Sequence, residues 1–206
     1  RSYECEWCGF QVYPTAGTPF ENTRTSLKDW FYVMFLFCAS RNGVAAKEVQ
    51  RQIGVTYKTA WRMCRLIRVY MGYVDGDHPI GGKGAVVEAD KAFIGGKDKK
   101  GEEDKKVVLG MVERGGDIVT RVIPDRGANS VTPHVVEMVK AGSRLVTDEA
   151  KAFRTLARDY DHHTVNHSAK EYVRGDVHTN NIEAFWSNLK RGIQGTYIHV
   201  SEQHLP

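Results

Sequence analysis

The sequence predicts a mixed α/β chain in which a small helical unit precedes a sheet flanked by helices. Three observations support this fold class. Residues 26–73 have helical patterns, and residues 74–85 (VDGDHPIGGKGA) are rich in Gly, Asp and Pro, which predicts a linker. After the linker the pattern changes to short strands and then to strands that alternate with helices. A mixed sheet covered by helices accommodates this order of elements.

Residues 1–25 are predicted to be a loop-like segment with short extended pieces. The segment carries a Cys-x-x-Cys pair, Cys5 and Cys8, followed by several Gly and Pro residues. A closed zinc site needs four ligands, so this pair supplies half of one. We therefore interpret residues 1–25 as a partial zinc ribbon.

The first helix is expected over residues 26–40, because Ser26 can cap it and Asp29 favours its first turn. It is mostly apolar, which predicts a place in the core. It also contains the longest apolar run of the chain, Trp30 to Ala39, about half the length that a membrane span needs. No signal peptide is apparent, so a cytoplasmic protein without a membrane partner is expected.

Two further helices have the helix-turn-helix pattern. A short amphipathic helix is expected over residues 45–53. Gly54 and Val55 then form a tight turn, and Thr56 caps a second helix that runs to about Met71. Residues 26–73 are therefore predicted to be a DNA-binding domain.

A basic stripe on the second of these helices supports this interpretation. Residues 41–72 hold seven Lys or Arg and one acid, while the whole chain of 206 residues has a net charge of only +4. Helical spacing places four of these cations on one stripe: Lys58, Arg62, Arg65 and Arg68. A local basic face suits a nucleic-acid contact, although a solvated face of a three-helix bundle has the same pattern.

Residues 86–206 are predicted to form a ribonuclease-H-like domain with a mixed five-stranded sheet. Strands are expected at residues 86–94, 107–113, 118–123, 144–147 and 162–165, with a charged hairpin loop at 97–106. Helices are expected at residues 130–141, capped by Ser130, at 150–158 and at 180–191. This order of elements is the one that ribonuclease-H-like nuclease domains have, an analogy at the level of fold.

Three acids fall where such a domain would use them. Asp90 lies inside the first strand, Asp148 ends the fourth, and Glu183 lies on the last helix. Three carboxylates from two neighbouring strands and a helix could bind two Mg²⁺ ions, because Mg²⁺ prefers oxygen ligands. Two such ions support in-line phosphoryl transfer. Each acid alone is more often a surface or turn residue.

The last helix also carries a cation. In HTNNIEAFWSNLKRG, Glu183 and Lys190 are seven residues apart, about two helical turns, so their side chains share a face. A metal-binding acid beside a phosphate-binding cation suits the cutting of nucleic acid. Trp186, between them, is interpreted as a core residue.

The segments VEADKAFIGGK, VTDEAKAF and HTNNIEAFWSNLKRGIQGTYIHVSEQHL carry these residues. Together they resemble the bacterial insertion-sequence transposases of the DDE type, most closely the ISXO-two-like subgroup. Two further segments extend the resemblance. CEWCGFQVYPTAGTPFENTRTSLKDWF is similar to that subgroup's zinc ribbon and following helix, and GVTYKTAWRMCRLIR to its helix-turn-helix.

The resemblance implies a metal-dependent recombinase that cuts one strand at each transposon end and joins the freed 3′-hydroxyl to target DNA. Asp90, Asp148 and Glu183 would hold two Mg²⁺ or Mn²⁺ ions, and Lys190 would contact DNA phosphate near the scissile bond. Arg191 is expected to be a further DNA-binding residue. DNA is the expected partner. A homo-oligomer on paired DNA ends and a location at the bacterial nucleoid are also expected.

The chain departs from the family pattern at several places. Some members have Asn as the third ligand, so Asn180 is an alternative to Glu183, which we prefer because a carboxylate binds hard cations more strongly. Lys91 stands where members more often have Glu, and strand alternation directs it away from Asp90. A second cysteine pair, and Zn²⁺, are expected only in a longer protein, and the catalytic domain is expected to be truncated at its C-terminus.

Two other functions fit parts of the sequence. A decayed or domesticated copy would bind DNA through the helix-turn-helix without catalysis. A general ribonuclease-H-like nuclease would use the acids, but it would not need the helix-turn-helix or the half ribbon.

Overall fold

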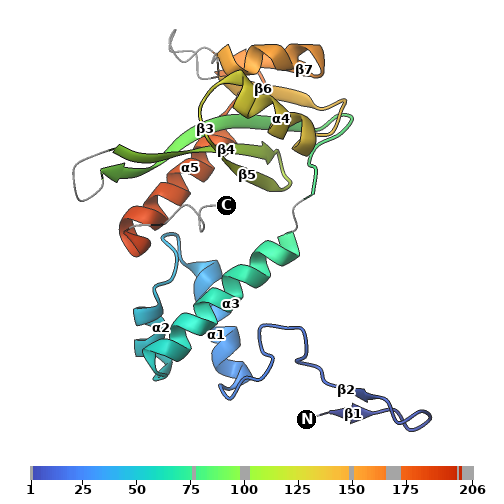
Figure 1. The fold of residues 1–206 in the computed structure, drawn as a ribbon, viewed down its shortest axis with the longest axis vertical. Helices are drawn as coiled ribbons and strands as arrows, with labels where there is room; N and C mark the ends of the chain where they lie inside the picture. Colours follow the sequence, from blue (N-terminus) through green and yellow to red (C-terminus); the bar gives the residue numbers. More distant parts are fainter. Residues whose placement is uncertain are drawn as a thin grey trace. The chain divides into compact units, whose positions relative to one another are not determined.

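The computed structural model describes residues 2–75, 78–97, 103–148, 151–165, 173–198 and 200. The chain forms two compact units, residues 1–76 and 77–206, each with a core of its own (Figure 1).

The first unit consists of a short hairpin followed by helices. The hairpin pairs β1 (Tyr3–Glu4) with β2 (Gln11–Val12), and the helices are α1 (Leu27–Ala39), α2 (Ala46–Ile53) and α3 (Tyr57–Asp75). Local chemistry sets the helix ends as the sequence predicts. The Ser26 hydroxyl accepts the Asp29 backbone N–H at 3.1 Å, and the Thr56 hydroxyl accepts that of Thr59 at 3.2 Å.

The turn between α2 and α3 depends on Gly54. This residue ends α2 in the left-handed conformation, with φ of 72°, and its N–H bonds to the Gln50 carbonyl. A residue with a Cβ is strained at this φ, whereas glycine is not. The turn therefore directs α3 away from α2 within two residues, Val55 and Thr56.

The expectation that α1 lies in the core is only half correct. Trp30 and Val33 are fully buried and pack against residues of α2 and α3. Phe31 and Phe35, on another face of α1, are 59% and 61% exposed. The apolar run surrounds the helix, but the two other helices cover only one side of it.

The second unit contains a five-stranded mixed sheet in the order β5-β4-β3-β6-β7. Its strands are β3 (Val86–Lys97), β4 (Glu103–Glu113), β5 (Ile118–Ile123), β6 (Arg144–Asp148) and β7 (Asp161–Val165). The pairs β3–β4 and β4–β5 are antiparallel, whereas β3–β6 and β6–β7 are parallel. This is the mixed sheet that the sequence predicts, and it is consistent with a ribonuclease-H-like domain.

Helices cover both faces of the sheet. One face packs against α4 (Ala128–Met138) and the 3-10 helix η1 (Lys151–Arg158), and the other packs against α5 (Asn180–Gly192). A small hairpin of β8 (Val173–Arg174) and β9 (Val177–His178) precedes α5, and a π-helical turn, η3 (Ile193–Tyr197), follows it. Because both faces of the central strand β3 are covered, its sequence has no clean polar–apolar alternation.

Several predicted boundaries are wrong. Helix α3 ends at Asp75 rather than at Met71, and α4 ends at Met138 rather than at residue 141. Helix α4 begins at Ala128, not after Ser130, because the Gly127 carbonyl already accepts the N–H groups of Ser130 and Val131. The charged loop at 97–106 is shorter than predicted. Ladder pairs such as Gly95 with Lys105 extend both strands into it, and its middle, 98–102, lies outside the described residues. Lys105, at this end of the hairpin, is exposed, so its charge stays in contact with water.

Within the described ranges, no helix combines the length and the apolar character that a bilayer crossing requires.

Candidate active site

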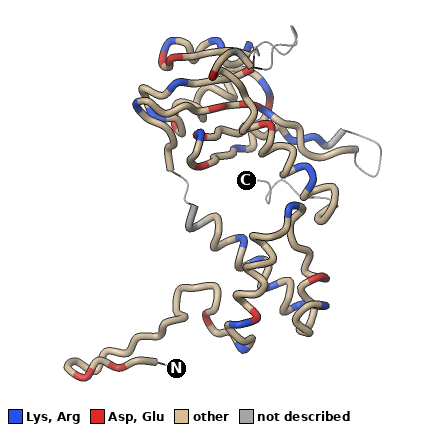
Figure 2. The backbone as a smooth tube through the Cα atoms, turned by 180° about the vertical axis from the view of Figure 1, so that it is seen from behind, with Lys and Arg blue, Asp and Glu red and all other residues tan. Residues whose placement is uncertain are grey.

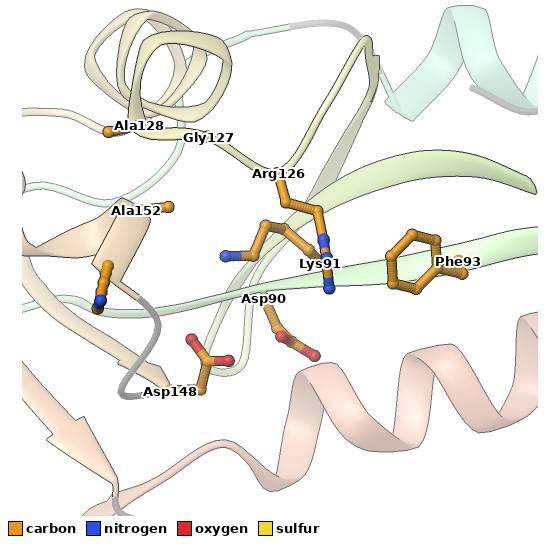
Figure 3. A pocket seen from close by; sticks show the side chains of 9 residues that line it. Asp90, Lys91, Phe93, Arg126, Gly127, Ala128, Asp148 and Ala152 are labelled. Atoms are coloured by element: carbon orange, nitrogen blue, oxygen red, sulfur yellow. The ribbon is translucent and has the colours of Figure 1, made fainter.

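Asp90 and Asp148 lie side by side in the second unit. The parallel pairing of β3 with β6 ends at Ala89 opposite Thr147, and the two aspartates are the next residues on these strands. Both line an open pocket of about 640 Å³ (Figure 3). Two acids that are 58 residues apart in the sequence therefore meet inside the sheet, where the pairing of β3 with β6 ends.

The surroundings of Asp90 oppose its negative charge. Burial raises the pKa of the Asp90 carboxyl above its ordinary value, and the nearby charge of Asp148 raises it further. The Lys91 backbone N–H and the Trp186 indole N–H, which donates to Asp90 Oδ2 at 3.1 Å, act in the opposite direction. Two half-buried carboxylates that repel each other are a suitable pair of oxygen ligands for a divalent cation.

Trp186 reaches Asp90 because β4 has a glycine, Gly110, where α5 packs against it. Gly110 pairs with Asp90 in the β3–β4 ladder. A Cβ at Gly110 would lie 2.6 Å from the Trp186 ring and 2.9 Å from Ile182. The missing side chain lets the buried indole of α5 lie against the sheet and donate to Asp90. Trp186 is thus a core residue, as predicted, and also a contact of the site.

Glu88, two residues before Asp90 on β3, holds the beginning of α5. Its carboxylate is 0% exposed, and it accepts the backbone N–H groups of Asn181 and Ile182 at 2.8 and 3.1 Å. Arg114 donates to the same carboxylate at 2.7 Å and to the carbonyls of Asp176 and His178 just before the helix. A buried charge of this kind needs such partners, and the N-terminus of a helix favours an anion.

The predicted third ligands do not line this pocket. Glu183, on the first turn of α5, is exposed, and its Oε1 accepts the Thr179 hydroxyl at 2.8 Å. Asn180 is also exposed. Among the described residues, no three His, Cys, Asp or Glu side chains are grouped as a metal site. The two aspartates are therefore together, and the assignment of a third ligand on α5 stays a prediction.

Lys190 and Arg191 lie at the far end of α5 with exposed side chains. Arg191 donates to the Ser187 carbonyl and to the Asn188 side chain within its own helix. Lys190 is two turns from Glu183, so the shared face that the spacing predicts is present on the helix.

Three cations share the pocket with the aspartates. Lys91, Arg126 and Lys151 come from β3, from the loop before α4 and from the start of η1. Sequence reasoning selected none of the three as site residues. The signal was weak, because Arg126 and Lys151 stand in ordinary loop and surface contexts and become neighbours of Asp90 only through the fold.

The predicted basic stripe is present on α3, and Figure 2 shows Lys and Arg recurring along the helices of the first unit. Lys58, Arg62 and Arg65 are exposed. Arg68 has a structural contact as well, because its guanidinium donates to the Val44 carbonyl at 3.0 Å and lies 5.1 Å from the Phe37 ring centre.

Cys5 and Cys8 are exposed free thiols on the turn between β1 and β2. Hydrogen bonds from the backbone N–H groups of Cys8 and Trp7 lower the pKa of the Cys5 thiol. N–H groups directed at sulfur stabilise a thiolate, the form that binds metal. The pair fits half of a zinc site, and in the part of the chain that the structure describes it gains no third ligand.

Two comparisons with known proteins agree with this geometry. A family model described as the ISXO2-like transposase domain matches residues 76–206. A protein of Halobacterium salinarum, described as an uncharacterized protein in transposable element ISH50, is 26% identical over 214 residues, which cover 93% of this chain and 70% of that protein. The family match takes in the whole sheet, both aspartates and α5, and on this evidence the chain belongs to the ISXO2-like family of insertion-sequence transposases.

Proposed function

We propose that this transposase binds the DNA ends of its insertion sequence, cuts them with divalent metal ions held at Asp90 and Asp148, and joins them to target DNA. The observation that carries the proposal is the meeting of these two carboxylates on neighbouring parallel strands, in an open pocket. Family membership supports DNA as the partner and divalent metal ions as the cofactor class.

Each residue has a separate task in this proposal. Asp90 and Asp148 hold the ions, and Glu183 completes the ligand set, with Asn180 as the alternative. Two bound Mg²⁺ or Mn²⁺ ions would supply activation of the attacking oxygen and stabilisation of the leaving oxygen. Lys190 and Arg191 contact DNA phosphate.

The Trp186 indole is suited to orient the Asp90 carboxylate. It donates to Oδ2, which restricts rotation of the carboxylate while both oxygens keep lone pairs for a cation. Glu88 acts at a distance, because its bonds to the first turn of α5 hold the helix that carries Trp186 and Glu183. Such supporting contacts commonly change metal affinity or activity by about 10- to 100-fold.

The first unit has the task of bringing DNA to the site. We propose that α2 and α3 act as a helix-turn-helix and that Lys58, Arg62, Arg65 and Arg68 contact the DNA. Gly54 in the turn and the exposed cations on one side of α3 support this. Cys5 and Cys8 would bind Zn²⁺ together with two further ligands, and the protein would act as a homo-oligomer on paired ends.

The test is a cleavage and strand-transfer assay on the element's own ends, with Mg²⁺ or Mn²⁺. Asp148→Asn is expected to lower cutting by at least about 100-fold, because it removes a proposed metal ligand, while DNA binding through the first unit persists. Asp159→Asn, at an exposed carboxylate outside the pocket, is the control and should cut normally. Equal cutting by both variants would refute the assignment.

The third ligand needs its own comparison. Glu183→Gln should abolish metal-dependent cutting if Glu183 binds the ion, and Asn180→Ala should then have a small effect. The opposite pattern would transfer the role to Asn180.

A further inference from the structure

The pocket of Asp90 and Asp148 has a second, cationic wall that the two-carboxylate chemistry does not use. Lys91 and Arg126 line it together with Phe93 (Figure 3), and Lys151 is a further residue of the lining. The two acids offset part of the repulsion among these three cations, and the cations still outnumber them in the lining, so the pocket attracts a ligand with negative charge.

Lys91 is held in place by an aromatic ring. Its ammonium lies 4.2 Å from the centre of the Phe153 ring, and that ring is fully buried beneath the pocket. The contact is a cation–π interaction, which attracts the ammonium without neutralising it. Figure 3 shows Lys91 and Asp90 leaving β3 on opposite sides, so the Lys91 ammonium does not bond to the Asp90 carboxylate of its own strand, although the charges of Asp90 and Asp148 still act on it through the pocket.

Arg126 is placed in a similar way. Its guanidinium lies 5.2 Å from the centre of the Phe93 ring, which is 44% exposed beside the pocket. An aromatic ring that supports a guanidinium leaves the N–H donors at the edge of the guanidinium group available to an oxyanion. Lys151, at the start of η1, adds an exposed third charge.

We propose that Lys91, Arg126 and Lys151 form a phosphate subsite, which binds the DNA phosphate next to the one being cut. The proposal rests on the proposed function, since it takes the strand whose scissile phosphate lies at Asp90 and Asp148. The carboxylates and the cations are different linings of one pocket, so neighbouring phosphates of one strand can contact both. This subsite fixes the position of the strand and needs no base contacts.

Salt dependence of DNA binding tests the subsite without catalysis. The full chain is titrated onto a short labelled duplex in EDTA, over a series of KCl concentrations. Lys91→Gln and Arg126→Gln are each expected to weaken binding and to flatten the plot of log K against log salt by about one unit per lost phosphate contact. Lys83→Gln, at an exposed lysine of the same unit outside the pocket, should leave the slope unchanged.

A second variant separates charge from packing at Lys91. Lys91→Arg keeps the positive charge and should keep the wild-type slope, even if its fit against Phe153 changes. Slopes of Lys91→Gln and Arg126→Gln equal to that of Lys83→Gln would overturn the proposal. A second contrary result is that inorganic phosphate competes with the duplex while Lys91→Gln and Arg126→Gln bind the duplex as the wild type does. That result would indicate a site for free anions and would also overturn the proposal.

Methylphosphonate substitution then identifies the phosphate. Neutralising single phosphates near the cleavage point should reveal one position that weakens wild-type binding but has little effect in Arg126→Gln, since the two changes remove the same contact. The readout is DNA binding and requires no cutting, so the subsite and the metal assignment can fail separately. If Asp148→Asn stops cutting and the lysine and arginine variants bind normally, only the subsite fails. If the slopes change and Asp148→Asn still cuts, only the metal assignment fails.

Discussion

Asp90 has a position that is unfavourable for an empty carboxylate and favourable for a metal ligand. It is half-buried, it lies near a second acid, and the Trp186 indole N–H donates to it. Since burial disfavours the charged form, the folded state should bind a proton at Asp90 more readily than the unfolded state does.

This shift has a definite consequence for stability against pH. The pKa of Asp90 is raised in the folded state, so stability falls as pH rises from the ordinary aspartate pKa through the raised one. In EDTA, Asp90→Asn should therefore melt at a higher temperature than the wild type near pH 7, and the difference should shrink toward acidic pH. Thermal unfolding followed by circular dichroism measures it.

Divalent metal supplies the control for the same variant. Mg²⁺ should raise the melting temperature of the wild type, because it binds only the folded site, and should raise that of Asp90→Asn much less. If the melting curves of the two proteins coincide at every pH and metal concentration, Asp90 is neither destabilised by its burial nor a metal ligand.

At the scale of elements, α5 depends on its fit to the sheet. Glu88 holds its first turn, and the gap at Gly110 admits its tryptophan. These residues are on β3 and β4, two neighbouring strands, so the antiparallel ladder between them sets the position of the helix relative to Asp90.

Filling the gap should disturb the site. In Gly110→Ala, the new Cβ would lie 2.6 Å from Trp186, so the ring must move and the indole bond to Asp90 should weaken. We expect a loss of about 1–3 kcal/mol in stability, as for overpacked cores, and a larger relative loss of metal-dependent cutting. Gly96→Ala, on β3, meets no atom within 4 Å and is the matched control. Equal stability and activity of the two variants would show that the close approach is unimportant.

The basic side of α3 has a separate test at the same scale. Arg62→Ala and Arg65→Ala should each weaken DNA binding and reduce its salt slope by about one unit, because the exposed cations release counterions from DNA. Arg68→Ala should also lower thermal stability, since Arg68 bonds to the Val44 carbonyl. Salt slopes unchanged in the first two variants would mean that the stripe is only a solvated face.

At the scale of the whole molecule, local sequence patterns predict the elements well and their contacts poorly. Ser26, Thr56 and Gly54 act within one turn of chain, so their roles follow from neighbouring residues. Asp90 and Asp148 could be selected because each lies at a strand in a recognisable motif.

The remaining parts of the site depend on register between distant segments. Gly110 matters because it pairs with Asp90, and Glu88 matters because it meets a helix start 93 residues later. Arg126 becomes a site residue because the loop between β5 and α4 lies at the pocket. The exposed face of α1 was missed for a related reason, since an all-apolar helix does not tell which side its neighbours cover.

If a metal ion bound by Asp148 takes part in cutting DNA, a change of ligand at this position should change which metal ion supports cutting. Asp148→Cys replaces an oxygen ligand with sulfur, which favours soft metal ions over Mg²⁺. We expect this variant to fail to cut the element's ends with Mg²⁺ and to recover cutting when the thiophilic ion Cd²⁺ is added, while Asp159→Cys retains cutting with Mg²⁺. Wild-type cutting by Asp148→Cys in Mg²⁺ would contradict this expectation.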